Sequence, residues 1–271
     1  MKKHPEYSNL LQFDILNKQP EIAHFSTTRK GGVSKGAFSS LNLGNYSDDD
    51  PLDIYENRQI LARMWYMDIS SFIVPHQTHS NKVLVIDEAL MSASPSHKIN
   101  TLYGVDATIT HLQNIFLCAT TADCVPVLLY DKEKQIVAAI HAGWKSLVGG
   151  IIENTITKMR IVYNTNPTHI VGAIGPSISQ KNYEVGDELI AEFNEAGFDL
   201  STVTFVNEQT NKWHIDLKHL SRNELVRLGV DPQQIETSTL CTFDEEELFF
   251  SARRQSIVSG RMLSGIMLDE S

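Results

Sequence analysis

The sequence has few cysteines, no pair of cysteines in a CxxC pattern and no long hydrophobic run. Its three cysteines are an odd number, which fits reduced thiols in a cytosol better than a disulfide framework. No apolar stretch of signal-peptide length follows the basic start Met1-Lys2-Lys3, and no later run approaches membrane-spanning length. We therefore expect a soluble, cytoplasmic protein without a membrane partner.

Basic residues are also in deficit. The 23 Lys and Arg residues face 33 Asp and Glu residues, which gives a formal net charge of −10. Because neutralising a phosphate backbone needs a basic surface, this balance argues against a nucleic-acid partner, although a small anion can still meet a few local arginines. Tracts rich in Pro, Ser or Gly are absent, and 42% of the residues are hydrophobic. The whole chain is expected to fold, as one large domain or two intimate ones.

The middle of the chain is predicted to form short strands. Runs of apolar and β-branched residues occur at residues 72–74, 83–86, 107–109, 115–118, 125–130 and 136–140. The short charged connection 131–134 predicts that the last two strands form a hairpin. Cys124 enters the first of these strands and His141 leaves the second, so antiparallel pairing brings both to one end of a sheet.

Helices are predicted on both sides of this region. Apolar residues at helical spacing predict them from Pro51 to about Met67, after Ser146 as far as Val162, after Asp187, and from Asp216 to Gly229. Further strands are predicted at residues 170–174, 203–206, 235–240 and 262–267. This order favours an α+β or α/β architecture with mostly mixed sheet.

Cys124, His141 and one more histidine can supply the three protein ligands of an open zinc site. Side chains three apart on an extended segment point to opposite faces, so His76 and His79 are not both expected at one metal. We select His79, because Pro75 indicates a turn near His76 and His79 leads into the next strand. A Cys and a His beside apolar strands are often plain core residues, but the polar and small residues around this pair favour an open site.

The same Cys–His pair can instead be a nucleophile and its base, as in a cysteine hydrolase. The two interpretations differ in whether metal or imidazolium holds the thiolate. Asp123 is then an orienting carboxylate or a general base, and a role as a strand-end cap is equally compatible with its position.

Arg29, Asn42 and Arg58 are the candidates for binding an anionic or polyhydroxy substrate, because guanidinium groups recognise phosphate and carboxylate through paired hydrogen bonds. Surface salt bridges are the alternative for the arginines. A second basic cluster near the C-terminus, which surface exposure alone explains, contains Arg253, Arg254 and Arg261.

Several motifs resemble one known family, which is described both as laccase-domain polyphenol oxidase and as purine nucleoside phosphorylase. They are His76-Gln77-Thr78-His79-Ser80, Thr121-Ala122-Asp123-Cys124-Val125-Pro126, His141-Ala142-Gly143-Trp144-Lys145 and the closing Ser259-Gly260-Arg261. The resemblance extends over nearly the whole chain through Thr27-Thr28-Arg29-Lys30-Gly31-Gly32-Val33-Ser34, Ser40-Leu41-Asn42-Leu43-Gly44, Gly172-Ala173-Ile174-Gly175-Pro176 and Cys241-Thr242.

The resemblance implies a single α+β domain over residues 1–271, with mixed sheets flanked by helices, and zinc bound by His79, Cys124 and His141. It further implies phosphorolysis of adenosine, inosine and methylthioadenosine, with adenosine deamination as an additional activity, and a related member edits peptidoglycan precursors. Lys145 departs from the family pattern, because an arginine is common there.

The laccase name can be tested on the sequence alone. Multicopper oxidases need paired His-x-His ligands, and the ten histidines of this chain include no such pair. A multicopper centre is therefore not expected, although a single copper can replace zinc in vitro because copper binds most nitrogen and sulfur sites more tightly.

Three hypotheses follow. The first is a zinc-dependent purine nucleoside phosphorylase in which Cys124, His141 and Asp123 form the catalytic group and arginines position phosphate and ribose. The second is a Cys–His or zinc amidase that cleaves a peptidoglycan precursor. The third is a non-enzymatic, metal-stabilised binding protein.

Overall fold

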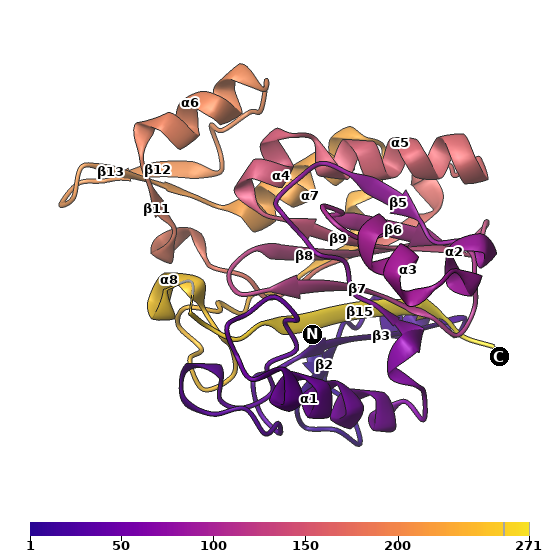
Figure 1. Ribbon diagram of the computed structural model, residues 1–271. Helices are drawn as coiled ribbons and strands as arrows, with labels where there is room; N and C mark the ends of the chain where they lie inside the picture. Colours follow the sequence, from indigo (N-terminus) through magenta and orange to yellow (C-terminus); the bar gives the residue numbers. More distant parts are fainter. Residues whose placement is uncertain (257, 271) are drawn as a thin grey trace.

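Two stacked six-stranded sheets form the centre of the structure, a computed structural model that describes residues 1–256 and 258–270 (Figure 1). The first sheet has the order β1 (Lys2–Lys3), β2 (Leu10–Gln12), β3 (Ile22–Thr27), β15 (Met262–Leu268), β7 (Phe116–Thr121), β4 (Phe72–Ile73). The second has the order β14 (Ile235–Thr237), β10 (Ile170–Ile174), β8 (Val125–Asp131), β9 (Ile136–Ala142), β6 (Ala107–Thr110), β5 (Val83–Val85). A small third sheet has the order β11 (Glu184–Val185), β13 (Lys212–Ile215), β12 (Thr204–Asn207).

Parallel and antiparallel pairs occur together in both large sheets. β4 pairs in parallel with β7, and β5 with β6 and β10 with β14, whereas the other pairs of these sheets are antiparallel. The expected α+β class with mixed sheets flanked by helices is therefore confirmed.

The helices surround the sheets, and some of them cover the outer faces of the two large sheets. They are α1 (Pro51–Met64), α2 (Glu88–Ser92), α3 (Pro95–Thr101), α4 (Trp144–Val148), α5 (Ile151–Tyr163), α6 (Asp187–Glu195), α7 (Leu217–Arg227) and α8 (Ala252–Gln255). Figure 1 shows α1 below the first sheet and α4, α5 and α7 above the second. The order of layers is thus helix, sheet, sheet, helix.

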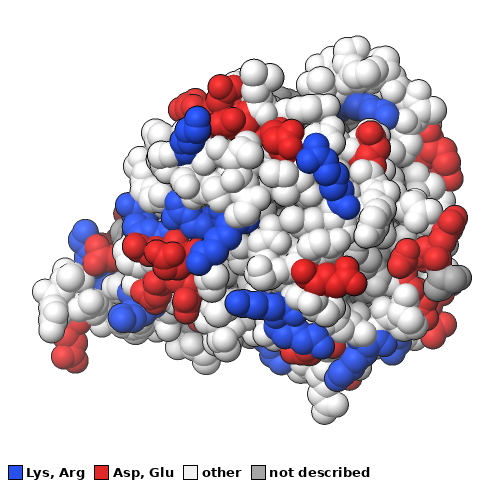
Figure 2. Space-filling view, turned by 90° about the horizontal axis from the view of Figure 1, so that it is seen from below, with Lys and Arg blue, Asp and Glu red and all other residues white. Residues whose placement is uncertain are grey.

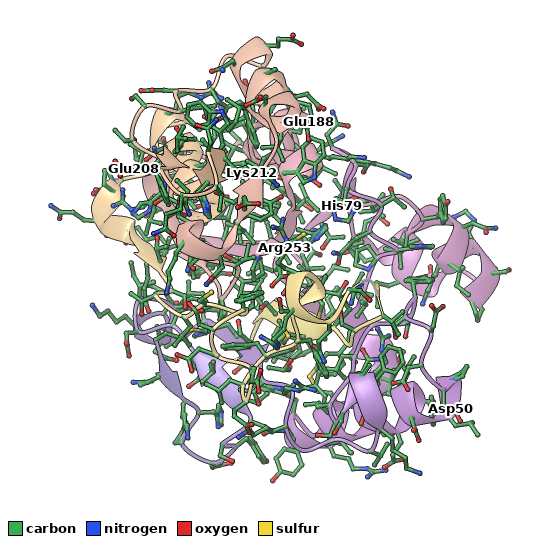
Figure 3. All side chains as sticks on the ribbon, turned by 90° about the vertical axis from the view of Figure 1, so that its left-hand side faces the viewer. Asp50, His79, Glu188, Glu208, Lys212 and Arg253 are labelled. Atoms are coloured by element: carbon green, nitrogen blue, oxygen red, sulfur yellow. The ribbon has the colours of Figure 1, made fainter. Side chains whose placement is uncertain are left out.

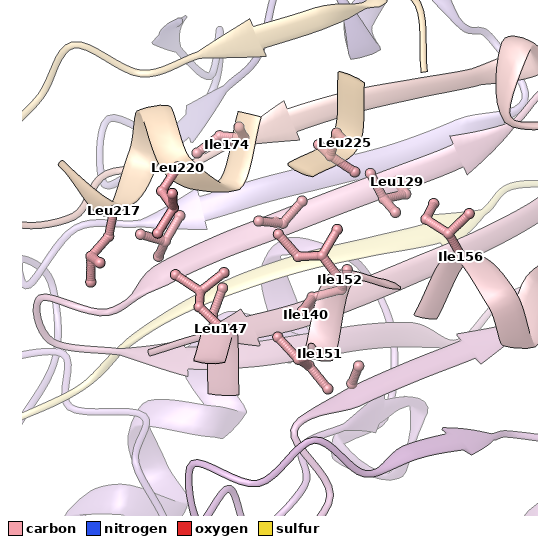
Figure 4. Close-up of a cluster of buried hydrophobic side chains, with 14 of the residues drawn as sticks. Leu129, Ile140, Leu147, Ile151, Ile152, Ile156, Ile174, Leu217, Leu220 and Leu225 are labelled. Atoms are coloured by element: carbon pink, nitrogen blue, oxygen red, sulfur yellow. The ribbon is translucent and has the colours of Figure 1, made fainter. Parts of the chain in front are cut away.

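Alternating side chains of β8 and β9 fill two different cores. Val127, Leu129 and Ile140 pack with apolar residues of α4, α5 and α7 (Figure 4). Leu128 and Val137 point the other way and pack against the first sheet. Because successive side chains of a strand alternate between faces, this hairpin is buried on both sides and is rigidly placed.

The sequence-based helix after Ser146 is corrected by the structure. Two helices, α4 and α5, replace the single one, because Gly149 and Gly150 interrupt it and Gly150 has a left-handed φ of 78°. Ser146 therefore lies inside α4 and not before the first helix. The helices predicted from Pro51, Asp187 and Asp216 begin where expected, and α1 ends at Met64, earlier than expected. The short helices α2, α3 and α8 were not predicted.

Two surface features bear on possible partners. Within the described ranges, no helix is both long and apolar enough to span a membrane. On the face seen in Figure 2, Lys and Arg side chains are interspersed with Asp and Glu side chains and do not form a continuous basic groove.

Candidate metal centre and cavity

The hairpin of β8 and β9 brings Cys124 and His141 together, as the sequence predicted. Pro126, two residues after Cys124, is the register partner of His141. His79 approaches from the loop before β5, and its Nε2 lies 3.6 Å from the Cys124 Sγ. One ligand atom from each of the three residues lies within 4.8 Å of the others. The structure thus gathers the three residues for which metal binding is predicted.

The carboxylate of Asp106 fixes two of these three residues. Its Oδ1 accepts a hydrogen bond of 2.7 Å from the Nδ1 of His141. The same carboxylate accepts the main-chain N–H groups of Thr78, His79 and Ser80 at 3.1, 3.1 and 2.8 Å. These bonds hold the loop in a tight turn in which His79 has a left-handed φ of 60°. Because Nδ1 of His141 is occupied, its Nε2 is the nitrogen left to bind a metal.

Asp106 was not among the residues predicted from the sequence, although its position before β6 is a signal for this role. Ala107 of β6 is the register partner of Ile140 of β9, so the residue before β6 lies beside His141. An aspartate just before a strand also resembles an ordinary turn residue, and only the pairing of β6 with β9 tells the two roles apart.

Electrostatics favour a thiolate at Cys124. Burial raises the pKa of this thiol, but the charge and hydrogen bonds of His141 and His79 outweigh burial and lower it below the ordinary value. Burial lowers the pKa of His141, but Cys124 and Asp106 outweigh burial and raise it. The thiolate is the form that binds metals and also the form that attacks carbonyl groups.

The donor set fits zinc. Two imidazole nitrogens and one thiolate are typical zinc ligands, and tetrahedral bonds of about 2.0–2.3 Å place neighbouring ligand atoms about 3.5 Å apart. The 3.6 Å separation of Cys124 Sγ and His79 Nε2 agrees with this spacing. All three residues line one cavity, so a metal held by them would be accessible to a small molecule in that cavity.

The cavity has a volume of about 400 Å³. Its lining consists of residues 44–47, 74–77 and 120–122 together with His79, Cys124, His141, Ala252 and Arg261. Figure 3 shows His79 and Arg253 near the centre of this face, with Glu208 and Lys212 of the small sheet above them. The cavity lies beside α8, which contributes Ala252 to its lining.

Arg261 is the arginine that lines the cavity. Its Nη1 donates to the carbonyl oxygens of Ser259 and Gly260 and to the Ser259 hydroxyl, at 2.6, 3.1 and 2.9 Å. Among the described residues no carboxylate forms a salt bridge with it. A Cβ on Gly44 would lie 2.6 Å from the Arg261 Cγ, so glycine is needed there to accommodate the arginine. A partly buried guanidinium without a carboxylate partner is suited to bind an anion.

Arg29, Asn42 and Arg58 do not line the cavity. Arg29 donates to the Ser39 carbonyl, and Arg58 donates to the Leu43 carbonyl. Asn42 is fully buried, and its Oδ1 accepts the main-chain N–H groups of Gly44 and Arg261. Asn42 and Arg58 therefore support the segment that carries residues 44–47, and the structure brings none of the three side chains into the cavity lining.

Asp123 is engaged away from the metal ligands. Its two carboxylate oxygens accept hydrogen bonds of 2.6 Å from Thr242, 2.9 Å from Ser251 and 2.7 Å from the main-chain N–H of Arg253. It thereby ties the turn before Cys124 to the C-terminal segment. A catalytic role for Asp123 stays a prediction.

A layered α+β fold with a His–Cys–His cluster in the wall of a cavity is typical of a metal-binding enzyme. Residues 23–269 match the family described as multi-copper polyphenol oxidoreductase laccase, and the chain belongs to this family. The resemblance noted in the sequence is thus confirmed.

Named relatives span almost the whole chain. The chain is 40% identical over 259 residues to a purine nucleoside phosphorylase of Bacteroides thetaiotaomicron, covering 96% of each chain. It is 39% identical over 257 residues to adenosine deaminase RL5 of an unknown prokaryotic organism, covering 95% of this chain and 98% of that one. The crystal structure of the hypothetical protein YfiH of Bacillus licheniformis is similar, with a TM-score of 0.89, 31% identity and 98% of each chain covered.

Proposed function

We propose that this protein is a cytoplasmic, zinc-dependent purine nucleoside phosphorylase acting on adenosine, inosine and methylthioadenosine. The observation that carries the proposal is that His79, Cys124, His141 and Arg261 line one cavity. The relatives named as a purine nucleoside phosphorylase and an adenosine deaminase support an enzyme of purine nucleosides. The three free cysteines agree with a reducing compartment.

The residues have separate parts in this reaction. His79, Cys124 and His141 would hold the zinc, which when bound supplies Lewis acidity to a substrate oxygen. Asp106 orients the His141 ring, and Arg261 binds and neutralises the phosphate dianion. In phosphorolysis a phosphate oxygen forms a bond to C1′ of the ribose while the bond from C1′ to the base breaks and the base takes up a proton. The products are the free base and ribose 1-phosphate, or the free base and 5-methylthioribose 1-phosphate when the substrate is methylthioadenosine.

Product analysis tests the proposal directly. The zinc-loaded protein is incubated with each nucleoside, with and without phosphate, and the products are identified by mass. Ribose 1-phosphate that forms only with phosphate supports phosphorolysis. Free ribose in both samples would show hydrolysis and contradict it, and conversion of adenosine to inosine would show the deaminase activity that we propose as a second reaction of the site.

An amidase acting on a peptidoglycan precursor is the second candidate. The pairing of a low-pKa thiol at Cys124 with His141 favours it, because this pair also activates a nucleophile. Retention of precursor cleavage after complete zinc removal would favour the cysteine hydrolase over the phosphorylase.

Replacing Arg261 by Ala is expected to slow the release of adenine from adenosine by at least about tenfold and to raise the phosphate requirement. This is the scale of losing one charge-assisted contact. Arg29→Ala is the matched comparison, because Arg29 donates to the carbonyl oxygens of Ser39 and Glu246, packs on the Phe250 ring and does not line the cavity. Initial rates at varied phosphate concentrations measure both effects. If both variants lost the same amount of activity, or if only Arg29→Ala lost activity, Arg261 would not be the specific phosphate contact. Arg29 would then again be the candidate for binding phosphate.

Purified protein is expected to carry about one zinc per chain and to leave phenolic substrates unoxidised, because zinc has no redox chemistry. Elemental analysis and an oxygen electrode measure the two quantities. A copper-reloaded sample serves as the comparison, since a single copper can occupy the same ligands. Steady oxygen consumption by the copper-free protein would contradict this expectation.

A further inference from the structure

An aromatic stack stands at the edge of the cavity. The rings of Tyr46 and His76 are nearly parallel, with an interplanar angle of 10° and centroids 3.5 Å apart. The ring of Tyr103 also contacts the His76 ring, with centroids 4.8 Å apart and an interplanar angle of 85°. Tyr46 and His76 line the cavity that contains the metal-ligand cluster and Arg261. A flat, π-rich wall is therefore within the candidate site itself.

The two rings of the stack are held very differently. The main chain of His76 is fixed on both sides, because its N–H donates to the Leu102 carbonyl and its own carbonyl accepts the N–H of Gly104. Tyr46 lies in a turn without regular structure, and its side chain is 54% exposed. Among the described residues, Tyr46 forms no hydrogen bond through its hydroxyl or its main chain. The main chain thus holds His76 in place. Tyr46 can move away from His76 without breaking a hydrogen bond.

We infer that His76 is the platform for the purine base of the substrate and that Tyr46 closes over the base from the other side. This inference rests on the proposed function. To admit a base between the rings, Tyr46 moves until the rings are roughly twice the present 3.5 Å apart. The base then replaces the ring-to-ring contact with two contacts of the same kind.

Recognition by stacking explains how one site accepts different purines. Every purine has a π-face, so stacking binds adenine and hypoxanthine alike without reading the group at C6. The ribose and phosphate remain for the metal cluster and Arg261. Stacking therefore contributes to the binding affinity of a ligand that has a purine base. It does not contribute to the affinity of a ligand without a base.

The test compares equilibrium binding of adenosine, inosine and ribose 1-phosphate by calorimetry. Tyr46→Ala and His76→Ala are each expected to weaken both nucleosides by about tenfold or more, the scale of losing one stacked ring, while affinity for ribose 1-phosphate stays unchanged. Tyr46→Phe keeps the ring and is expected to bind like the unaltered protein. Tyr55→Ala is the matched control, because Tyr55 is 57% exposed and does not line the cavity. Zinc content is measured in every variant, so that loss of metal is not mistaken for loss of stacking.

The binding results test the stacking platform separately from the proposed reaction. Unchanged nucleoside affinity in Tyr46→Ala and His76→Ala, or equal weakening of ribose 1-phosphate, overturns the platform. Failure of the unaltered protein to bind either nucleoside overturns it as well. Binding that depends on Tyr46 and His76 without any phosphorolysis overturns the proposed reaction and leaves the platform standing.

Discussion

Replacing Cys124 by Ala is expected to remove the bound zinc and to lower nucleoside turnover by at least about 1000-fold, since metal catalysis is worth several kcal/mol. The fold is expected to survive, with a loss in the free energy of unfolding below about 1 kcal/mol. Cys124 immediately precedes β8, is only partly buried, and its Sγ lies 3.6 Å from the His79 Nε2. Elemental analysis, turnover and thermal unfolding of the same preparation measure the three quantities.

Cys118→Ala is the matched control for this variant. Cys118 is buried among Phe25, Phe116 and other apolar residues, and it does not line the cavity. Its replacement leaves a small void and is expected to lower stability while zinc and turnover are kept. The two cysteines should thus show opposite patterns. Global unfolding of the Cys124 variant, or zinc retained at full occupancy, would contradict the assignment of Cys124 as a ligand.

The hairpin was predictable because its signals are local. A short charged connection between two apolar strands fixes antiparallel pairing, and that pairing alone places Cys124 beside His141. The third member, His79, was chosen from the turn signal at Pro75, which is also local. Its actual position depends on Asp106, which is distant in sequence and comes close to it through the pairing of β5 with β6.

The substrate contacts were not predictable to the same extent. Residue type shows which side chains can bind an anion, but the direction of each side chain is set by packing between distant segments. Arg29 and Arg58 donate to main-chain carbonyls of nearby loops, whereas Arg261, at the start of the last strand, lines the cavity. The aromatic pair of Tyr46 and His76 joins two loops that no periodic pattern connects.

Asp106→Asn is expected to weaken zinc binding by about 10–100-fold and to lower the free energy of unfolding by about 1–3 kcal/mol. The carboxylate accepts hydrogen bonds from the His141 ring and from the N–H groups of Thr78, His79 and Ser80. An asparagine has only one acceptor oxygen, so its NH₂ group faces donors and leaves part of this set unpaired. Competition with a zinc-binding dye and denaturant unfolding measure the two effects.

Asp123→Asn separates support of the metal ligands from support of the fold. Asp123 is a second buried carboxylate with several donors, but those donors belong to Thr242, Ser251 and Arg253, and not to a metal ligand. Its replacement is therefore expected to reduce stability by a similar amount while zinc affinity changes much less. If Asp123→Asn instead abolished turnover with zinc fully bound, Asp123 would take part in catalysis. Equal losses of zinc affinity in both variants would mean that the hydrogen bond from His141 to Asp106 makes no specific contribution to zinc binding. Asp106 would then act only by stabilising the loops around the site.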